Sequence, residues 1–164
     1  MRHIISVLME NESGALSRVV GLFSARGYNI ESLSVAPTED ETLSRLTLVS
    51  SGSDQVIEQV LKQLNKLIEV IKVVDLSDFK HVEREMMFIK VEAKHADGVS
   101  SIKQVSDIFE GNIIDFNKST FTIELSGRSD KLDAFIEAMQ EQIIIEVVRS
   151  GCIGIARGST SLRV

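Results

Sequence analysis

The feature that most constrains this 164-residue chain is one order of hydrophobic patterns that occurs twice along it. In the first half, runs of alternating apolar and polar residues are separated by segments whose apolar residues recur every three or four positions. Alternation is typical of strands, and the longer spacing is typical of helices. The resulting order is strand, helix, strand, strand, helix, strand. The predicted strands are 2–9, 28–35, 43–50 and 68–76, with helical patterns at 16–23 and 56–64.

The second half of the chain repeats this order. Strands are predicted at 86–93, 113–116, 121–125 and 143–148, with helices at 99–109 and 129–140. Local matches support a duplication. Ser53-Asp54 and Ser129-Asp130 each open the second helix of their half, and each half then runs into an Ile-Glu-Val strand. Matches that recur in the same order favour a repeated unit over coincidence.

This order is the split βαβ pattern of ferredoxin-like folds, in which an antiparallel sheet carries both helices on one face. The expected fold class is therefore α+β, with two tandem ferredoxin-like (βαββαβ) domains. The polar segment 77–81 separates the halves, so the expected domains are 1–76 and 77–164. The stretch 153–160 is rich in Gly and Ser, and no order is assumed for it.

The composition argues against several classes of function. The chain has 18 basic and 24 acidic side chains, a balance unlike that of proteins with a broad basic surface for nucleic acid. The single Cys152 excludes an internal disulfide framework and a four-cysteine zinc site. No apolar stretch approaches the roughly 18 residues of a membrane span, and no signal peptide is recognisable. We expect a cytoplasmic protein with neither a nucleic acid nor a membrane as partner.

The sequence shows no catalytic or metal-binding constellation. The three histidines, His3, His81 and His95, have no helical i, i+4 spacing, and no Gly-rich nucleotide motif occurs. Cys152 has no flanking base, so a buried small hydrophobic role is favoured over a reactive thiol. We therefore expect no catalytic residue and no metal site in this chain.

The most informative segment is the turn between the first predicted strand and the first helix, where Gly14 stands at the helix start. The first backbone amides of a helix lack intrahelical acceptors and carry positive partial charge. Because glycine has no side chain, a carboxylate can approach those amides closely. The structural alternative is that Asn11 or Ser13 caps the helix and Gly14 eases the turn. The residues by themselves leave both interpretations open.

A second asparagine, Asn29, begins the second predicted strand, which lies at the outer edge of a split βαβ sheet. An uncovered strand edge invites pairing with a second copy. A two-fold dimer would then bring the helix-start loop of one chain near Asn29 of the other. Such an interface offers helix amides to a carboxylate and side-chain amides to an ammonium, with Leu16 and Ile30 among the apolar walls. We hypothesise a small-molecule pocket between two copies of the chain.

At this point the chain resembles a known family, the small regulatory subunits of acetolactate synthase (acetohydroxyacid synthase). The resemblance covers essentially the whole chain, because many motifs fall in the order of the family. These motifs are Asn11–Arg18, Arg26–Leu33, Leu43–Arg45, Lys62–Leu67, Val82–Glu85, Gly111–Asp115, Lys131–Asp133 and Arg149–Gly151. The first half is similar to the ACT domain, an amino-acid-sensing βαββαβ module, and the second to the ferredoxin-like domain of these subunits.

The resemblance implies a non-catalytic partner of an enzyme. In the family, a large subunit carries thiamine diphosphate, Mg²⁺ and FAD and performs the chemistry of branched-chain amino acid biosynthesis, the route to valine and isoleucine. The small subunit carries no cofactor, raises that activity, and confers feedback inhibition by a branched-chain amino acid, usually valine. The alternative is a stand-alone ACT-type amino-acid-sensing protein that regulates a different enzyme.

The resemblance also implies where the effector binds. In the family, effector sites lie between two ACT domains of a homodimer, at the loop after the first strand of one chain and the second strand of the other. Carried onto this sequence, that selects seven effector-binding residues: Asn11, Gly14, Ala15, Leu16, Asn29, Ile30 and Ala36.

Overall fold

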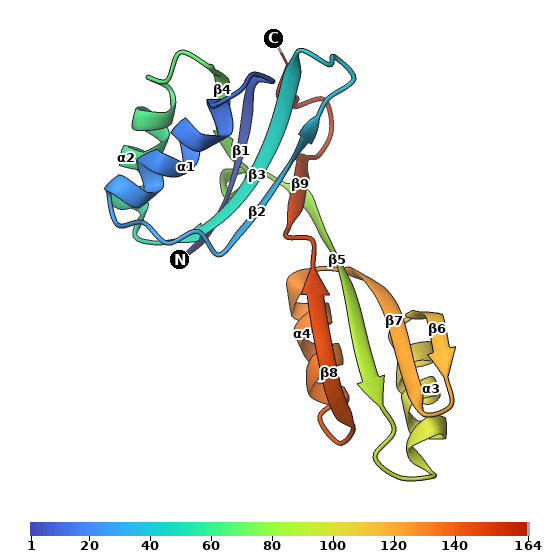
Figure 1. The fold of residues 1–164 in the computed structure, drawn as a ribbon. Coiled ribbons are helices and arrows are strands. Elements are labelled where there is room, and N and C mark those ends of the chain that lie inside the picture. The colour runs from blue at the N-terminus through green and yellow to red at the C-terminus, as the bar shows by residue number, and fades with distance from the viewer. Residues whose placement is uncertain (164) are drawn as a thin grey trace. The chain divides into compact units, whose positions relative to one another are not determined.

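The computed structural model describes residues 1–163, which divide into two compact units. The first unit comprises residues 1–83 together with 152–163, and the second comprises Arg84–Gly151. Each unit is built around a βαββαβ pattern of four antiparallel strands and two helices (Figure 1). This confirms the predicted α+β class and the repeated ferredoxin-like pattern.

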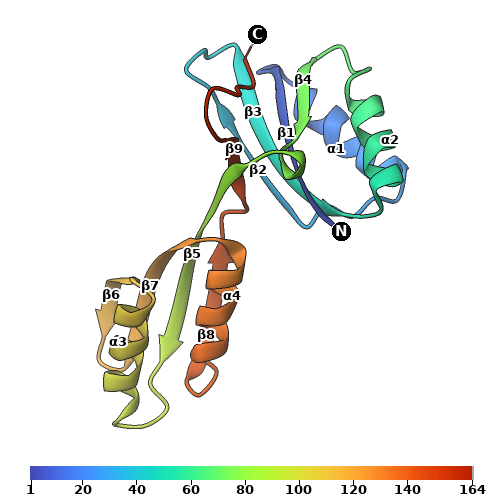
Figure 2. The ribbon, with the colours of Figure 1, turned by 180° about the vertical axis from the view of Figure 1, so that it is seen from behind.

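The first unit is built on a sheet with the strand order β2-β3-β1-β4, so β2 and β4 are its edges. Both helices cover one face of this sheet (Figures 1 and 2). The elements are β1 (Arg2–Glu10), α1 (Ala15–Ala25), β2 (Ser32–Pro37), β3 (Leu43–Ser51), α2 (Asp54–Leu64) and β4 (Val70–Asp75). On the helix side, apolar residues of β1 and β3 pack against Val19 and Phe23 of α1 and against Val60 of α2. This packing buries the apolar stripes that the sequence pattern predicts.

The second unit repeats the arrangement with the strand order β6-β7-β5-β8. Its elements are β5 (His81–Glu92), α3 (Gly98–Ile108), β6 (Asn112–Asn117), β7 (Thr120–Gly127), α4 (Ser129–Ala138) and β8 (Ile143–Arg149). The core gathers around Ile89 of β5, Ile123 of β7, Ile102 of α3 and Phe135 of α4. The pairing Ile89↔Ile123 places β5 beside β7, as the split βαβ topology requires.

The two compact units differ from the predicted division of the chain at residue 76, because residues 152–163 group with the first unit. Residues 77–83 and 152–163 lie in that unit rather than in a domain spanning 77–164. The cause is a further strand, β9 (Ile153–Ala156), which pairs with β5 in the stretch where no order was assumed. Beside it, Cys152 packs with Ile4, Val49 and Leu76. β1 is therefore buried along nearly its whole length, on both faces.

Two further boundaries differ from the prediction. The second strand starts at Ser32 rather than at residue 28, because residues 28–31 form a loop that approaches the sheet through a hydrogen bond from the Glu31 amide to the Val49 carbonyl (2.9 Å). The predicted linker is also structured. A 3₁₀ turn, Leu76–Asp78, follows β4, and Asp75 caps it by accepting from the Ser77 amide (2.9 Å).

Candidate functional site

The turn between β1 and α1 is shaped by the conformation of Gly14. Gly14 is the N-cap residue of α1 and has φ 90°, in the left-handed region that glycine adopts without strain. No side chain caps this helix. The interpretation in which Asn11 or Ser13 caps α1 is therefore wrong. By contrast, α2 is capped by Ser53, whose side chain accepts from the Val56 amide.

Because Gly14 offers no side chain, the start of α1 keeps unpaired donors. The Ala15 amide donates to the Glu12 carbonyl (3.2 Å) and the Arg18 amide to the Gly14 carbonyl (3.0 Å). Within residues 1–163, the amides of Leu16 and Ser17 have no such acceptor. They point along the positive end of the helix dipole, and the first turn contains no acidic side chain to neutralise it. This is the arrangement that binds a carboxylate or another small anion.

Asn11 has a different role from the predicted cap. Its backbone amide donates to the Thr42 carbonyl (2.7 Å), and its side-chain amide donates to the Glu41 carbonyl (2.9 Å). These bonds fasten the turn to the loop between β2 and β3. In that loop, hydrogen bonds from the Thr42 hydroxyl and amide hold the pKa of Asp40 below its ordinary value. Asn11 therefore sets the position of the turn, and its side-chain oxygen stays available as an acceptor.

The apolar residues predicted to line the pocket differ in exposure. Ala15 is buried, whereas Leu16 and Ile30 are half-buried and pack on the edge of the first core. An ion pair between Arg18 of α1 and the mostly buried Glu69 fixes this end of the helix against the residues that precede β4. The turn thus has a rigid backbone with the partly exposed side chain of Leu16 beside it, whereas Ile30 lies beyond the other end of α1.

The remaining predicted residues lie elsewhere in the unit. Asn29 is exposed in the loop after α1, where its backbone carbonyl accepts from the Ser50 hydroxyl (2.7 Å). α1 has 11 residues, so about 16 Å of helix separates Asn29 from Gly14. Ala36 is exposed on β2 and pairs with Arg45, so it lies on the sheet face opposite the helices. One chain therefore brings Asn11, Gly14, Ala15 and Leu16 together, and does not bring Asn29, Ile30 or Ala36 to them.

The groups considered for catalysis are structural or dispersed. No cluster of three or more His, Cys, Asp or Glu side chains in the described part of the chain could hold a metal ion. Cys152 is buried, as predicted, and burial together with its hydrogen bond to Glu83 raises the pKa of its thiol to about 11. A thiol with such a pKa is a poor nucleophile at neutral pH.

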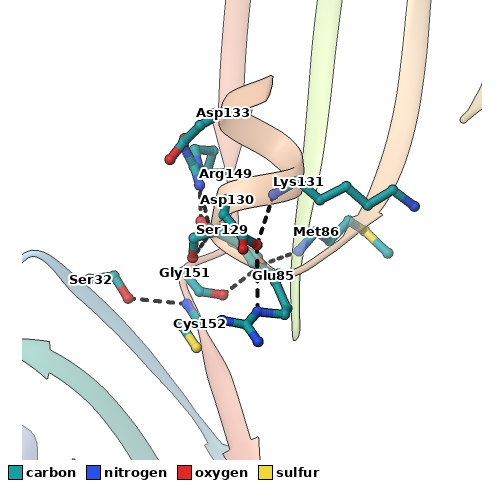
Figure 3. A network of polar contacts seen from close by, with 12 residues as sticks. Ser32, Glu85, Met86, Ser129, Asp130, Lys131, Asp133, Arg149, Gly151 and Cys152 are labelled. Atoms are coloured by element: carbon teal, nitrogen blue, oxygen red, sulfur yellow. Dashed lines mark hydrogen bonds and ion pairs between the residues drawn. The ribbon is translucent and has the colours of Figure 1, made fainter. Parts of the chain in front are cut away.

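One polar network was not anticipated from the sequence. Arg149 of β8 donates two hydrogen bonds to Glu85 of β5, Nε to Oε1 at 2.9 Å and Nη2 to Oε2 at 2.8 Å (Figure 3). It donates a third to Asp133 of α4 (2.6 Å), and the Ser129 hydroxyl also donates to Glu85 (3.0 Å). Hydrogen bonds to Glu85 and Asp133 raise the pKa of Arg149. The pairing Met87↔Arg149 brings these residues together, and spacing along the chain does not reveal it.

Fold and turn together define a class of protein. Two βαββαβ units, the first with an uncapped helix start beside its central strand, are typical of ACT-type proteins that carry a paired ferredoxin-like unit. Among residues 1–163, no helix is long and apolar enough to cross a membrane.

Comparisons with known proteins identify the family. The profile described as an AHAS small subunit-like ACT domain matches residues 5–72, and the profile described as the small subunit of acetolactate synthase matches residues 84–158. The acetolactate synthase isozyme 3 small subunit of Salmonella typhimurium is 52% identical over 99% of this chain and 100% of its own length. The acetolactate synthase small subunit of Haemophilus influenzae is 54% identical over 99% of each.

A solved structure agrees with these sequence matches. The crystal structure of the acetolactate synthase small subunit from Thermotoga maritima superposes with a TM-score of 0.87 and 37% identity, over 98% of this chain and 99% of that one. The chain belongs to the acetolactate synthase small-subunit family.

Proposed function

We propose that this chain is the regulatory subunit of an acetolactate synthase in the cytoplasm, which activates a catalytic large subunit and confers feedback inhibition by valine or another branched-chain amino acid. The chain itself supplies no catalysis and no cofactor. Thiamine diphosphate, Mg²⁺ and FAD belong to the large subunit. Full-length matches to proteins named as small subunits support a role beside a larger partner, and disfavour a stand-alone sensor that shares only the first unit.

The observation that carries the effector site is the pair of unpaired amides at the start of α1. An amino acid presents a carboxylate, an ammonium and a side chain. The carboxylate fits the amides of Leu16 and Ser17, the side-chain oxygen of Asn11 can accept from the ammonium, and the half-buried Leu16 and Ile30 offer contact to an aliphatic side chain. Asn29 supplies a further polar contact, and Ala36 lines the wall.

The same geometry argues for a homodimer. Gly14 and Asn29 lie at opposite ends of α1, so a pocket that uses both requires two chains. β2 is an edge strand of the first unit's sheet, and in residues 32–37 it pairs only with β3. A two-fold axis beside β2 and α1 would place the Gly14 end of one chain against the Asn29 end of the other.

Regulation then requires that effector binding be linked to an equilibrium between two arrangements of the subunits. An effector changes activity only if it binds one arrangement of the subunits more tightly than another. A pocket shared between chains satisfies this condition, because the ligand contacts depend on how the two chains are placed. Binding of valine would favour the arrangement that does not activate the large subunit.

Reconstitution of the holoenzyme tests this function. The chain is purified with a tagged thiamine-dependent large subunit, and acetolactate formation is measured with and without the chain over a valine titration. We expect co-purification, a rise in activity, and inhibition as valine increases. Activation without any response to valine, leucine or isoleucine would remove the effector proposal. Failure to bind or activate the large subunit would remove the regulatory-subunit proposal.

A further inference from the structure

One ion pair joins the start of α1 to the rest of the first unit. The guanidinium of Arg18, the fourth residue of α1, pairs with the carboxylate of Glu69, the residue directly before β4. Within residues 1–163, no other side chain of α1 makes a hydrogen bond or an ion pair. The remaining contacts of the helix are apolar, through Val19 and Phe23 among others.

Glu69 contacts both sides of the turn that contains Gly14. Its backbone carbonyl accepts from the amide of Glu10, the last residue of β1 (2.8 Å), and its carboxylate reaches Arg18 on α1. The side chain of Glu69 is 12% exposed, whereas that of Arg18 is 61% exposed. Because a buried carboxylate is costly without a compensating partner, the guanidinium is held at this position.

The position of Arg18 on the helix is not explained by the helix itself. Arg18 lies about one turn from Gly14, whose carbonyl accepts from its amide (3.0 Å). A cation close to the start of a helix opposes the helix dipole, so helix stability disfavours an arginine here. The unpaired amides of Leu16 and Ser17 lie between the two residues along the chain. The ion pair therefore restrains the part of α1 that carries these amides.

The second unit lacks this ion pair. In both units the last strand shifts register once against the central strand, and the shift follows Val70 in β4 and Ile144 in β8. By this correspondence the counterpart of Glu69 is Ile143, an exposed apolar residue that cannot form an ion pair. The pair occurs in the unit with the proposed effector turn, and the βαββαβ fold does not require it.

We propose that Glu69 and Arg18 are positioning residues of the effector site, whose ion pair holds the uncapped start of α1 at the end of β1. A bound amino acid then meets the amides of Leu16 and Ser17 and the side chain of Asn11 at once. This inference rests on the proposed function. Apolar packing is non-directional and allows α1 to shift along the sheet, whereas an ion pair restrains such a shift. Several groups that bind one small ligand must be held to within about 0.5 Å.

Valine titration of the reconstituted holoenzyme tests this role. Glu69→Gln removes the carboxylate charge and nearly keeps the shape of the side chain. The control is Glu146→Gln, which breaks the exposed pair with Lys90 in the same Ile-Glu-Val sequence of the second unit. We expect Glu69→Gln to raise the valine concentration for half-inhibition by about threefold to tenfold, while maximal activation of the large subunit is retained. Glu146→Gln should change neither quantity.

Variants of Arg18 separate positioning from a general loss of stability. Arg18→Lys keeps a cation and should retain most of the valine response, whereas Arg18→Met should weaken the response as Glu69→Gln does. The double variant of Arg18→Met and Glu69→Gln should lose no more than either single change, because both changes break one pair. Additive losses, or loss of activation together with inhibition, would contradict the positioning role.

The wild-type titration distinguishes failure of this inference from failure of the proposed function. If the wild-type holoenzyme responds to valine and Glu69→Gln leaves the half-inhibiting concentration unchanged, the positioning role alone is wrong. If the wild-type holoenzyme responds to no branched-chain amino acid, the effector site is wrong and the positioning role with it.

Discussion

At the scale of single residues, the conformation of Gly14 decides which substitutions can probe the proposed effector pocket. Its φ of 90° disfavours any side chain, yet no heavy atom lies within 4 Å of the place that a Cβ would take. A substitution there meets backbone strain but no clash. Asn tolerates left-handed backbone better than most residues and has nearly the same shape as Asp. Gly14→Asn is therefore the matched control for Gly14→Asp.

Gly14→Asp should abolish valine inhibition while activation of the large subunit remains. The new carboxylate would sit at the amides of Leu16 and Ser17 and repel or replace the carboxylate of the effector. We expect the valine concentration for half-inhibition to rise by about tenfold or more, equivalent to ~1.4 kcal/mol. Gly14→Asn should shift it far less. Equal loss in both variants, measured in the reconstituted holoenzyme, would speak for backbone strain rather than for an anion site.

The ion pair between Arg149 and Glu85 predicts a residue-level effect in the second unit. Breaking a buried pair costs about 3–5 kcal/mol when the remaining charge stays buried. Because Glu85 is buried and the side chain of Arg149 is 30% exposed, we expect Arg149→Met to lower the free energy of unfolding by about 2 kcal/mol at pH 7. Urea denaturation measures this difference. Lys62→Met, which removes an exposed partner of Glu58, should leave stability nearly unchanged.

The same pair makes the effect depend on pH. Burial tends to raise the pKa of Glu85, but hydrogen bonds from Arg149 and Ser129 outweigh it and hold the pKa below its ordinary value of 4.5. A carboxyl whose pKa is lowered by folding stabilises the protein above its ordinary pKa, and this stabilisation is lost as pH falls through the folded-state value. The difference between the wild type and Arg149→Met should therefore shrink below about pH 4.5. A difference that grows in acid would show that the pair is not its source.

At the scale of elements, the spacing of apolar residues along the chain predicts the helices, the strands and their order. The stripes of α1 and α2 and the order of eight strands follow from spacing along the chain, and the structure confirms them. The unpaired amides of α1 do not follow from the sequence alone, because a cap by Asn11 or Ser13 fits the same residues. The side chain of Asn11 instead bonds Glu41, a contact across 30 residues. The Arg149–Glu85 pair depends in the same way on strand register.

The missed strand β9 has a related physical cause. The segment Ile153–Ala156 has only four residues and contains Gly154, so its strand signal is weak. The glycine is required by packing: a Cβ at position 154 would lie 2.8 Å from Cδ1 of Leu76 and 3.5 Å from Cγ2 of Ile4. β9 is therefore specified by tertiary contact with the first unit, which local sequence does not display.

Gly154→Val tests whether β9 is an integral part of the first unit. The added side chain must displace Leu76 or lift β9 from its place, and overpacking of this kind costs about 1–3 kcal/mol. Gly21→Ala in α1 is the control, because no heavy atom lies within 4 Å of its Cβ position and alanine favours a helix by roughly 0.5–1 kcal/mol. Thermal unfolding should show a lower midpoint for the first variant and an unchanged or higher one for the second. An unchanged midpoint for Gly154→Val would mean that β9 contributes nothing to the unit.

At the scale of the whole molecule, the proposed pocket makes a prediction that only an assembly of two chains can fulfil. Each pocket would combine the Gly14 end of one chain with Asn29 of the other, because α1 separates the two within a chain. Asn29→His, which replaces a slim amide with a larger ring, should damage the pocket from the other side. Homodimers of either variant have two damaged pockets and should lose valine inhibition.

Heterodimers distinguish a shared pocket from one within a chain. When one chain carries Gly14→Asp and its partner carries Asn29→His, one of the two shared pockets contains both changes and the other contains neither. When one chain carries both changes and its partner is wild type, every shared pocket has one change. Differently tagged chains allow each heterodimer to be purified and reconstituted with the large subunit. We expect valine inhibition to return in part only in the first heterodimer. A pocket contained in a single chain would give the reverse, since only the second heterodimer would then hold an intact site.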